Sequence, residues 1–534
     1  MKKILLTILI FAGSITLLFA AKFQIKIEPL AGEKWYGAYT AQAWPNTPLD
    51  EIQFQPFDAN FAKTDLATEN LGNQAAPFLL SNMGRYVWSD EPFAFEFKNG
   101  VLILYSDAEK INAIDAGETL REAYLTAFQK HFPASGETPN PLMFKIPQYN
   151  TWIELGTNQN QRDVMKYAEN VLKNNFPPGV FMIDDIWQKY YGNFEFDAAK
   201  FHDPKGMVDS IHAEGFRVML WVTPFISADS KEFRFLEKKG GLVMNTQTNS
   251  PVLIKWWNGY SACLDLSKDF AFNWLKDNLK KLQDLYGIDG FKFDAADFHF
   301  YTDYPTNTSG NLQAELYAKL GTEFGFNEFR ACWKMGNQPL AQRLQDKAYS
   351  WDDLNLLIPD MISAGLIGHP FTCPDMIGGG LIQTFENIDY SKFDQELMIR
   401  SAQLQALMPM MQFSVAPWRV LDEKHLSLCR DVALLHAKMG DYILALAKQA
   451  AKDGEPIIRH MEYVFPHEGF KTCNDQYMLG SEYLVAPMIN KGTTREVKLP
   501  KGKWIDELGK KYKGGKTVTI DVPLSRLPYF KLQK

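Results

Sequence analysis

The chain has 534 residues, 46% of them hydrophobic and 14% aromatic, so it can bury a large core and is expected to form two or three domains. Its 56 Lys and Arg against 63 Asp and Glu give a formal charge of -7, too mild and too mixed for the basic surface that nucleic acid or an anionic membrane requires. A neutral small-molecule substrate fits better, and the 13 Trp, 22 Tyr and 38 Phe supply rings of the kind on which sugars stack.

The first twenty residues have the pattern of a signal peptide. Lys2 and Lys3 precede an apolar run from Ile4 to Ala20, which ends in small residues before Lys22. An uncleaved membrane anchor is the alternative, because the run is slightly long for a signal peptide and slightly short for a spanning helix. We expect residues 1–20 to direct a periplasmic or secreted location, with no membrane insertion after cleavage.

Residues 21–140 contain short alternating runs separated by turns. FAFEF and VLILY flank the turn Asn99-Gly100 and predict an N-terminal β-sandwich, which ends in the Pro- and Gly-rich stretch at 133–142. Residues 448–534 return to this pattern with YLVAPMI and KTVTIDVPL. They predict a small C-terminal β domain.

Between these regions, residues 141–447 alternate strand-like apolar runs with helical segments. We expect helices at 162–173, 204–214 and 269–285, after Gly310 and from near Asp352. The strand-like segments are KIPQYNTWIEL, GVFMIDD, RVMLWVTP, GIDGFKFDAAD and FRACWK. This alternation predicts an α/β fold, and its length favours a closed (β/α)8 TIM barrel over a doubly wound sheet.

Polar residues stand at the carboxyl ends of these strands, which is the face where such barrels place active sites: Asp184, Asp185, Trp221 and Asp294. Hydrolysis of a glycosidic bond with retention needs two carboxyl groups about 5 to 5.5 Å apart. Asp294 is the candidate nucleophile, because Lys292 on the same strand side would hold it ionised. The alternative is a turn or helix-cap residue, which is the better interpretation of an arbitrary Asp.

Asp346 is the candidate general acid, in the polar loop RLQDKAYSW after the expected strand FRACW. The residues alone leave alternatives open, because a lone Asp in such a loop is more often solvated, and Asp352 or Asp353 would serve equally as helix caps. Catalysis by two carboxyl groups needs a raised pKa at Asp346 and a depressed one at Asp294.

Other side chains near predicted strand ends are candidates for sugar contacts: Trp221, Trp256, Trp257, Arg330, Trp351 and His369. Each alone is more often a core residue than a ligand contact. The nine histidines include no HExxH or HxH pair and the five cysteines no CxxC spacing, so no metal site is indicated. No phosphate-binding glycine loop or GxSxG elbow occurs, and we expect no cofactor.

A series of segments in order along the chain resembles glycoside hydrolase family 31. They are GRYVWSDEPF (84–93), PQYNTWIE (147–154), IDDIWQKYYGNFEFD (183–197), GFRVMLWVTPF (215–225), GIDGFKFDAAD (287–297) and PFTCPDMIGG (370–379). QYMLGSEYLVAP and LPKGKW extend the resemblance into the C-terminal region, so it covers nearly the whole mature chain.

The resemblance implies residue roles. Asp294 matches the family's nucleophile, and Asp346 matches the acid/base in a loop that precedes a Trp, here Trp351. The positions that match the lining of the first sugar subsite are Asp184, Asp185, Lys292, Arg330 and Asp375, with Trp221, Trp256 and Trp257 as its walls.

Two departures bear on the substrate. Gln345-Asp346 replaces the usual Gly-Asp, and MPMMQFSVAPWR at 408–419 replaces the familiar Arg-x-His segment. The chain instead resembles the branch that contains myogenesis-regulating glycosidase and bacterial α-galactosidases. We therefore expect an exo-acting retaining α-glycosidase that favours α-galactosides. An α-glucosidase or α-xylosidase, a glucan lyase, and a non-catalytic carbohydrate-binding relative are the alternatives.

Overall fold

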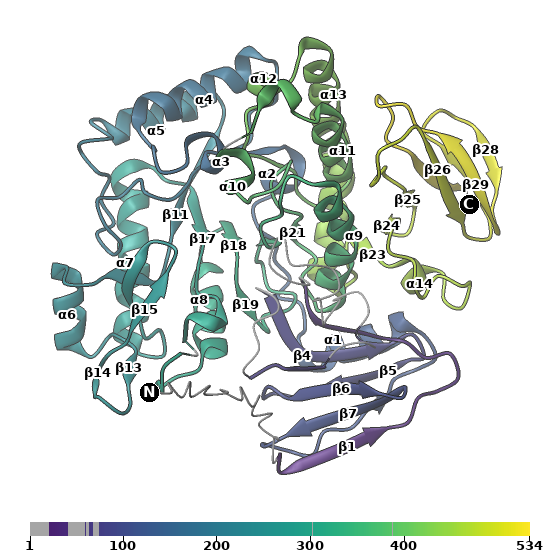
Figure 1. Cartoon of the computed structure of the whole chain (residues 1–534), viewed down its shortest axis with the longest axis horizontal. Coiled ribbons are helices and arrows are strands. Elements are labelled where there is room, and N and C mark those ends of the chain that lie inside the picture. Colours follow the sequence, from purple (N-terminus) through teal and green to yellow (C-terminus); the bar gives the residue numbers. More distant parts are fainter. Residues whose placement is uncertain are drawn as a thin grey trace, which may run out of the picture.

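The computed structural model describes residues 21–40, 59, 63–67, 74–301, 303–386 and 388–533. The predicted signal peptide lies outside these residues. A central barrel carries an N-terminal pair of sheets on one side and a small C-terminal β domain on another (Figure 1). Among the helices that the structure describes, none combines the length and the apolar character needed to cross a bilayer.

Eight parallel strands form the barrel, which confirms the predicted fold. Neighbours follow the order β21, β20, β18, β17, β11, β10, β9, β22. A parallel bridge between Met376 and Gln412 joins the two ends of this order and nearly closes the ring. The strands are β9 (Gln148–Asn150), β10 (Val180–Ile183), β11 (Arg217–Val222), β17 (Gly290–Phe293), β18 (Phe326–Phe329), β20 (Gln342–Arg343), β21 (Thr372–Cys373) and β22 (Gln412–Phe413).

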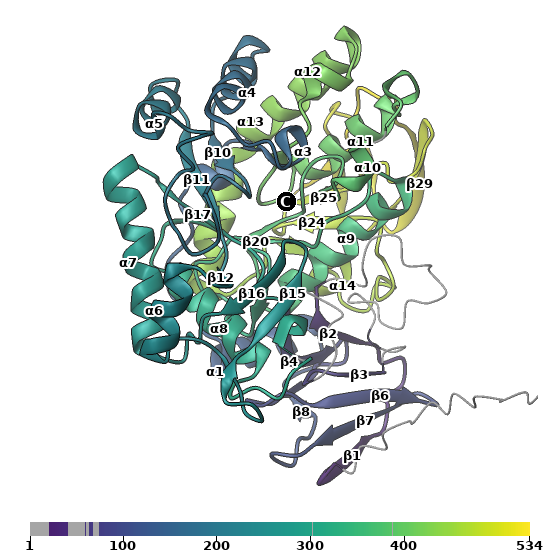
Figure 2. The same ribbon diagram turned by 60° about the vertical axis from the view of Figure 1, so that its left-hand side comes forward.

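Helices surround the barrel strands (Figure 2) and confirm the helical segments expected from periodicity. Asn160, Asp203 and Ser350 cap the first turns of α4, α5 and α9 through their side-chain oxygens. The principal helices are α4 (Gln161–Lys173), α5 (Pro204–Ala213), α7 (Asp269–Tyr286), α8 (Gly310–Gly321), α9 (Trp351–Leu366), α11 (Gln395–Ala406) and α13 (Glu423–Asp453).

The segment FRACW does not form the single strand that we expected. β18 ends at Phe329, and Cys332–Trp333 forms β19, which leaves the barrel and pairs with β4 of an N-terminal sheet. The barrel strand that precedes Asp346 is β20, whose two residues are too few to show any apolar periodicity.

The N-terminal region is a sandwich of two sheets. Its apolar core includes Trp333 of β19 and Ala314 of helix α8. The side-chain amide of Gln74, in β4, donates to the backbone oxygens of Arg330 at 2.8 Å and Arg343 at 2.6 Å. One sheet contains β1 (Phe23–Ile27), β7 (Val101–Ser106), β6 (Ala94–Lys98) and β3 (Lys63–Asp65), and the other β19, β4 (Gln74–Ser81), β5 (Arg85–Trp88), β8 (Ile114–Asp115) and β2 (Trp35–Tyr39). Helix α1 (Leu120–His131) follows.

The C-terminal β domain begins after α13. The expected boundary at 447/448 falls inside this helix, whose apolar spacing continues to Asp453 and which ends at Gly454 in a left-handed conformation. The domain contains β23 (Ile458–Arg459), β24 (Tyr477–Leu479), β25 (Tyr483–Val485), β30 (Tyr529–Gln533), β27 (Lys503–Asp506) and β28 (Lys511–Lys513), with the pair β26 (Thr494–Leu499) and β29 (Lys516–Asp521).

A small antiparallel sheet follows barrel strand β11. It contains β12 (Phe225–Ser227), β16 (Gly259–Cys263) and β15 (Leu253–Trp256), and the turn between β15 and β16 holds Trp257 and Asn258. The shorter elements are α2 (Leu142–Lys145), α3 (Trp152–Leu155), α6 (Lys231–Lys239), α10 (Gln383–Glu386), α12 (Pro417–Val420), α14 (Met461–Val464), β13 (Met244–Asn245), β14 (Ser250–Pro251) and 3-10 turns at Phe298–Tyr301 and Tyr390–Lys392.

Candidate active site

A cavity of about 320 Å³ opens at the carboxyl ends of the barrel strands. Acidic, basic and aromatic side chains share its wall, which a purely apolar ligand site would not require. Its lining residues are Trp152, Asp184, Asp185, Trp221, Trp257, Asn258, Lys292, Asp294, Arg330, Arg343, Asp346 and Gly380 to Gln383.

Asp294, directly after β17, is held in one orientation. The indole N–H of Trp221 donates to its Oδ2 at 2.6 Å, and the backbone N–H of Ala295 donates to its Oδ1 at 2.8 Å. Lys292 Nζ lies 3.8 Å from Oδ2 and Arg330 Nε 3.7 Å from Oδ1. Burial opposes ionisation, but Lys292 and the nearby arginines prevail and lower the pKa of Asp294, as the sequence predicted.

Asp346 enters the cavity from the loop after β20. Its Oδ1 accepts from Arg343 Nη1 at 2.7 Å, and its Oδ2 lies 3.4 Å from Arg330 Nη1. Burial alone would raise the pKa of Asp346, but the two guanidinium groups lower it below its usual range. The expectation of a raised pKa at Asp346 is therefore wrong for the conformation that the structure describes.

Asp375 braces the Asp346 loop from behind. Its Oδ1 accepts from Arg343 Nη1 at 2.8 Å, and its Oδ2 accepts the backbone N–H groups of Lys347 at 2.8 Å and Gly380 at 2.9 Å. A Cβ at Gly380 would lie 2.6 Å from Asp346 Oδ1 and 2.8 Å from Asp375 Oδ1. A side chain at position 380 would therefore displace these two carboxylates.

Two acidic residues that follow β10, Asp184 and Asp185, form another part of the cavity wall. Asp184 Oδ2 accepts from Lys292 Nζ at 2.7 Å. Asp185 accepts from Asn258 Nδ2 at 2.7 Å and from the Tyr191 hydroxyl at 3.1 Å. Burial, with the Asp184 charge beside it, raises the pKa of Asp185 to about 7. This wall therefore presents oxygen and nitrogen atoms that suit the hydroxyl groups of a sugar.

Aromatic residues complete the cavity. Trp257 is 46% exposed and covers the guanidinium of Arg330, whose Cζ lies 5.4 Å from the indole centroid. The indole N–H of Trp152 donates to the backbone oxygen of Gly380 at 2.9 Å, which holds the Gly380 segment over the cavity. A half-exposed indole beside hydrogen-bonding groups is an amphipathic surface of the kind that a sugar ring contacts.

Comparison with models of known protein families shows to which family the chain belongs. The TIM-barrel domain of glycosyl hydrolases family 31 matches residues 146–446, and the C-terminal domain of the same family matches residues 454–532. The chain belongs to glycoside hydrolase family 31. The resemblance inferred from the sequence is confirmed.

Curated family 31 relatives cover most of the chain. The myogenesis-regulating glycosidase of Mus musculus is 30% identical over 417 residues, 75% of this chain and 58% of the relative. An α-xylosidase of Emericella nidulans is 25% identical over 561 residues, 93% of this chain and 66% of the relative. The chain thus spans less than two thirds of the length of either relative.

Solved family 31 structures share the fold. The dextranase of Flavobacterium johnsoniae, complexed with glucose, aligns with a TM-score of 0.82 at 20% identity, over 95% of this chain and 66% of the other. An α-xylosidase from a soil metagenome, complexed with xylose, aligns with a TM-score of 0.81 at 22% identity, over 96% and 79% of the two chains.

Four expected contact residues of this family 31 chain do not line the cavity. Trp256 lies behind Trp221, with the rings stacked at 6.5 Å, and Asp375 lies behind the acid loop. Trp351 begins α9 and donates to Asp394. His369 precedes β21, so it belongs to the amino-terminal end of the barrel, opposite the cavity, where burial lowers its pKa to about 4.

The sequence interpretation missed seven lining residues: Trp152, Asn258, Arg343, Gly380, Leu381, Ile382 and Gln383. Arg343 is 1% exposed, although a charged residue in a polar segment reads as solvated. Its guanidinium is buried because Asp346, Asp375 and Glu328 surround it. The available sequence signal was that Arg343 stands three residues before the candidate acid Asp346, close enough to pair with its carboxyl group.

Proposed function

We propose that this chain hydrolyses a terminal α-linked hexose with retention of configuration. The observation that carries the proposal is that Asp294 and Asp346 line one cavity and contact the same guanidinium, that of Arg330. Asp294 is the nucleophile and Asp346 the acid/base. Two carboxyl groups on one barrel face are the equipment that a retaining glycosidase needs.

The reaction takes two steps. Asp294 Oδ1 or Oδ2 attacks the anomeric carbon while the bond to the departing oxygen breaks, and that oxygen receives its proton from Asp346. In the second step, Asp346 removes a proton from water, and the water oxygen displaces Asp294 from the anomeric carbon. The lowered pKa of Asp294 keeps the attacking group ionised.

Asp346 must hold a proton before the first step. Since Arg343 and Arg330 favour its ionised form, their contacts with Asp346 must weaken when the substrate enters. The conformation described here suits the base role of the second step, in which the carboxylate form is the active one. Asp375 keeps Arg343 engaged when Asp346 releases it.

We favour an α-galactosyl unit as the glycone. The departures at Gln345-Asp346 and residues 408–419 support this branch of the family, as does the 30% identity to the myogenesis-regulating glycosidase. Asp185 and Asn258 add polar atoms to the wall beside Asp184. Such groups discriminate between epimers, because an unpaired buried polar group costs free energy with the wrong one.

Aryl α-glycosides test the glycone. We expect kcat/KM for the p-nitrophenyl α-galactoside to exceed that for the α-glucoside and the α-xyloside by roughly 100-fold or more. A preference for glucoside or xyloside would keep the mechanism and reassign the glycone, because relatives include α-glucosidases and α-xylosidases. Sugar-induced thermal stabilisation without product release would indicate a binding protein.

The acidic limb of the pH profile tests the charge on Asp294. We expect Lys292→Met to move the acidic limb of kcat/KM to higher pH, because losing the ammonium raises the pKa of Asp294. Asp184→Asn should move it the other way, since Lys292 then loses a competing carboxylate. If the acidic limbs of the two variants moved in the same direction, this assignment would be contradicted.

The segment 1–20 supports a periplasmic or secreted location for this enzyme. Amino-terminal sequencing of protein recovered outside the cytoplasm would test this, with a mature start after Ala20 as the expected result.

A further inference from the structure

The residue after Asp346 points away from the cavity. Lys347 is 6% exposed, and its Nζ lies 2.9 Å from Oδ2 of Asp360, a fully buried residue in α9. Its Nζ also donates to the backbone oxygen of Gln345 at 3.2 Å. Among the described residues, Lys347 supplies the only cation within 4 Å of Asp360.

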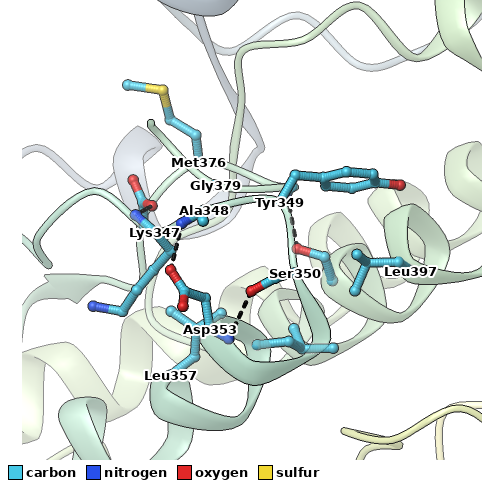
Figure 3. A pocket seen from close by; sticks show the side chains of 13 residues that line it. Lys347, Ala348, Tyr349, Ser350, Asp353, Leu357, Met376, Gly379 and Leu397 are labelled. Atoms are coloured by element: carbon cyan, nitrogen blue, oxygen red, sulfur yellow. Dashed lines mark hydrogen bonds between the residues drawn. The ribbon is translucent and has the colours of Figure 1, made fainter. Parts of the chain in front are cut away.

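The backbone around Lys347 is fixed on both sides. The backbone oxygen of Lys347 accepts from Leu381 N–H at 3.1 Å, and the next N–H, that of Ala348, donates to Asp353 Oδ2 at 2.5 Å. Figure 3 shows this hydrogen bond, with the Lys347 and Asp353 side chains on the same side of the loop. Asp353 and Asp360 both belong to α9, so one helix holds two consecutive loop residues.

A buried ion pair is a costly way to stabilise a fold. Moving both charges out of water offsets most of their attraction, and replacing such a pair with apolar groups is often neutral. What the pair does supply is direction, because Asp360 is the one carboxylate within 4 Å of the Lys347 ammonium among the residues that the structure describes. Burial raises the pKa of Asp360 to about 6, and the Lys347 ammonium opposes this rise by favouring the carboxylate form.

We propose that the Lys347–Asp360 ion pair positions the acid/base Asp346. By drawing Lys347 toward α9, the pair sets the backbone of the loop so that the preceding side chain projects into the cavity. This inference rests on the proposed role of Asp346. Lys347 and Asp360 are positioning residues, since neither lines the cavity.

Leaving-group dependence separates positioning from stability. An alkyl α-glycoside needs a proton on its departing oxygen, whereas an α-glycosyl fluoride needs little protonation. We expect Asp360→Asn to lower kcat/KM for the alkyl glycoside by roughly 10- to 100-fold, as a displacement of about 1 Å does, and that for the fluoride by under about 3-fold. kcat/KM is the right measure because it reports the first step.

A double variant keeps the test valid if the single variant folds poorly. Lys347→Met/Asp360→Leu removes both charges and fills the space, so its thermal midpoint should lie near that of the unaltered protein. Its kcat/KM for the alkyl glycoside should remain low, because the ion pair that positions the loop is absent. Full activity of this variant on the alkyl glycoside would overturn the proposal, as would equal losses on both substrates.

Two further variants complete the design. Asp506→Asn breaks a comparably buried pair with Arg526 in the C-terminal domain and should show no leaving-group dependence. Asp346→Ala should show the strongest. If Asp346→Ala lacks it, the acid/base assignment fails; if Asp346→Ala shows it while Asp360→Asn behaves as Asp506→Asn does, only the positioning role fails.

Discussion

Replacing Asp294 with Asn is expected to abolish turnover, with kcat/KM lower by roughly 10⁴-fold or more. The amide has the shape of the carboxylate but cannot form the glycosyl ester, so the first step loses its nucleophile. Because Asp294 is 6% exposed and isosteric with Asn, packing should change little. Initial rates on the preferred aryl α-glycoside measure the effect.

Azide distinguishes loss of the nucleophile from a general defect. In an Asp294→Gly variant, azide can occupy the vacated space and attack the anomeric carbon from that face, giving the β-glycosyl azide. Trp221 and Lys292 remain to shape the site. Turnover by Asp294→Asn above about a tenth of the original rate, in a protein that melts normally, would remove Asp294 from this role.

Replacing Asp346 with Ala is expected to lower kcat/KM for alkyl α-glycosides by roughly 10² to 10⁴-fold, the usual contribution of a general acid. Activated substrates should lose far less in the first step, and the glycosyl-enzyme should accumulate because water lacks its base. Azide, which needs no base, should accelerate release and give the α-glycosyl azide. A pre-steady-state burst of aryl leaving group measures this accumulation.

Asp352→Ala is the matched control. Asp352 is exposed in the first turn of α9, six residues after Asp346, and the sequence had indicated it as a possible cap of this helix, a position that Ser350 occupies. Its loss should change both substrates by similar small factors. A leaving-group effect at Asp352 and none at Asp346 would transfer the acid role.

The length of each strand decided how well the barrel could be predicted. Val180–Ile183 and Arg217–Val222 are long enough to show apolar character, and both were found from it. β20, β21 and β22 have two residues each, and their side chains include Gln342, Arg343 and Gln412. Two residues are too few to show an apolar pattern, so these strands can be recognised only from the three-dimensional structure of the barrel.

Some residues of the candidate site could likewise be predicted from the sequence, and others could not. Lys292 in β17 and Asp294 directly after it stand two residues apart, so their spacing alone predicted that they lie together and that the pKa of Asp294 is lowered. Asp346 depended on the family resemblance, and its pKa was misjudged because Arg343 was not expected beside it. His369 was misplaced because it is only six residues from Asp375 in the chain. The short strand β21 lies between them, so the two residues stand at opposite ends of the barrel.

The amide of Gln74 connects the N-terminal sandwich to the candidate active site. Its two hydrogen bonds hold the backbones of Arg330 and Arg343, the residues whose charges govern both carboxyl groups, and β19 extends the barrel chain into the same sheet. The sandwich and the barrel are therefore joined by side-chain and backbone hydrogen bonds directly beside the candidate active site. A chimera that exchanges the sandwich must bring an equivalent amide at this position, or it joins a correctly folded barrel to an inactive site.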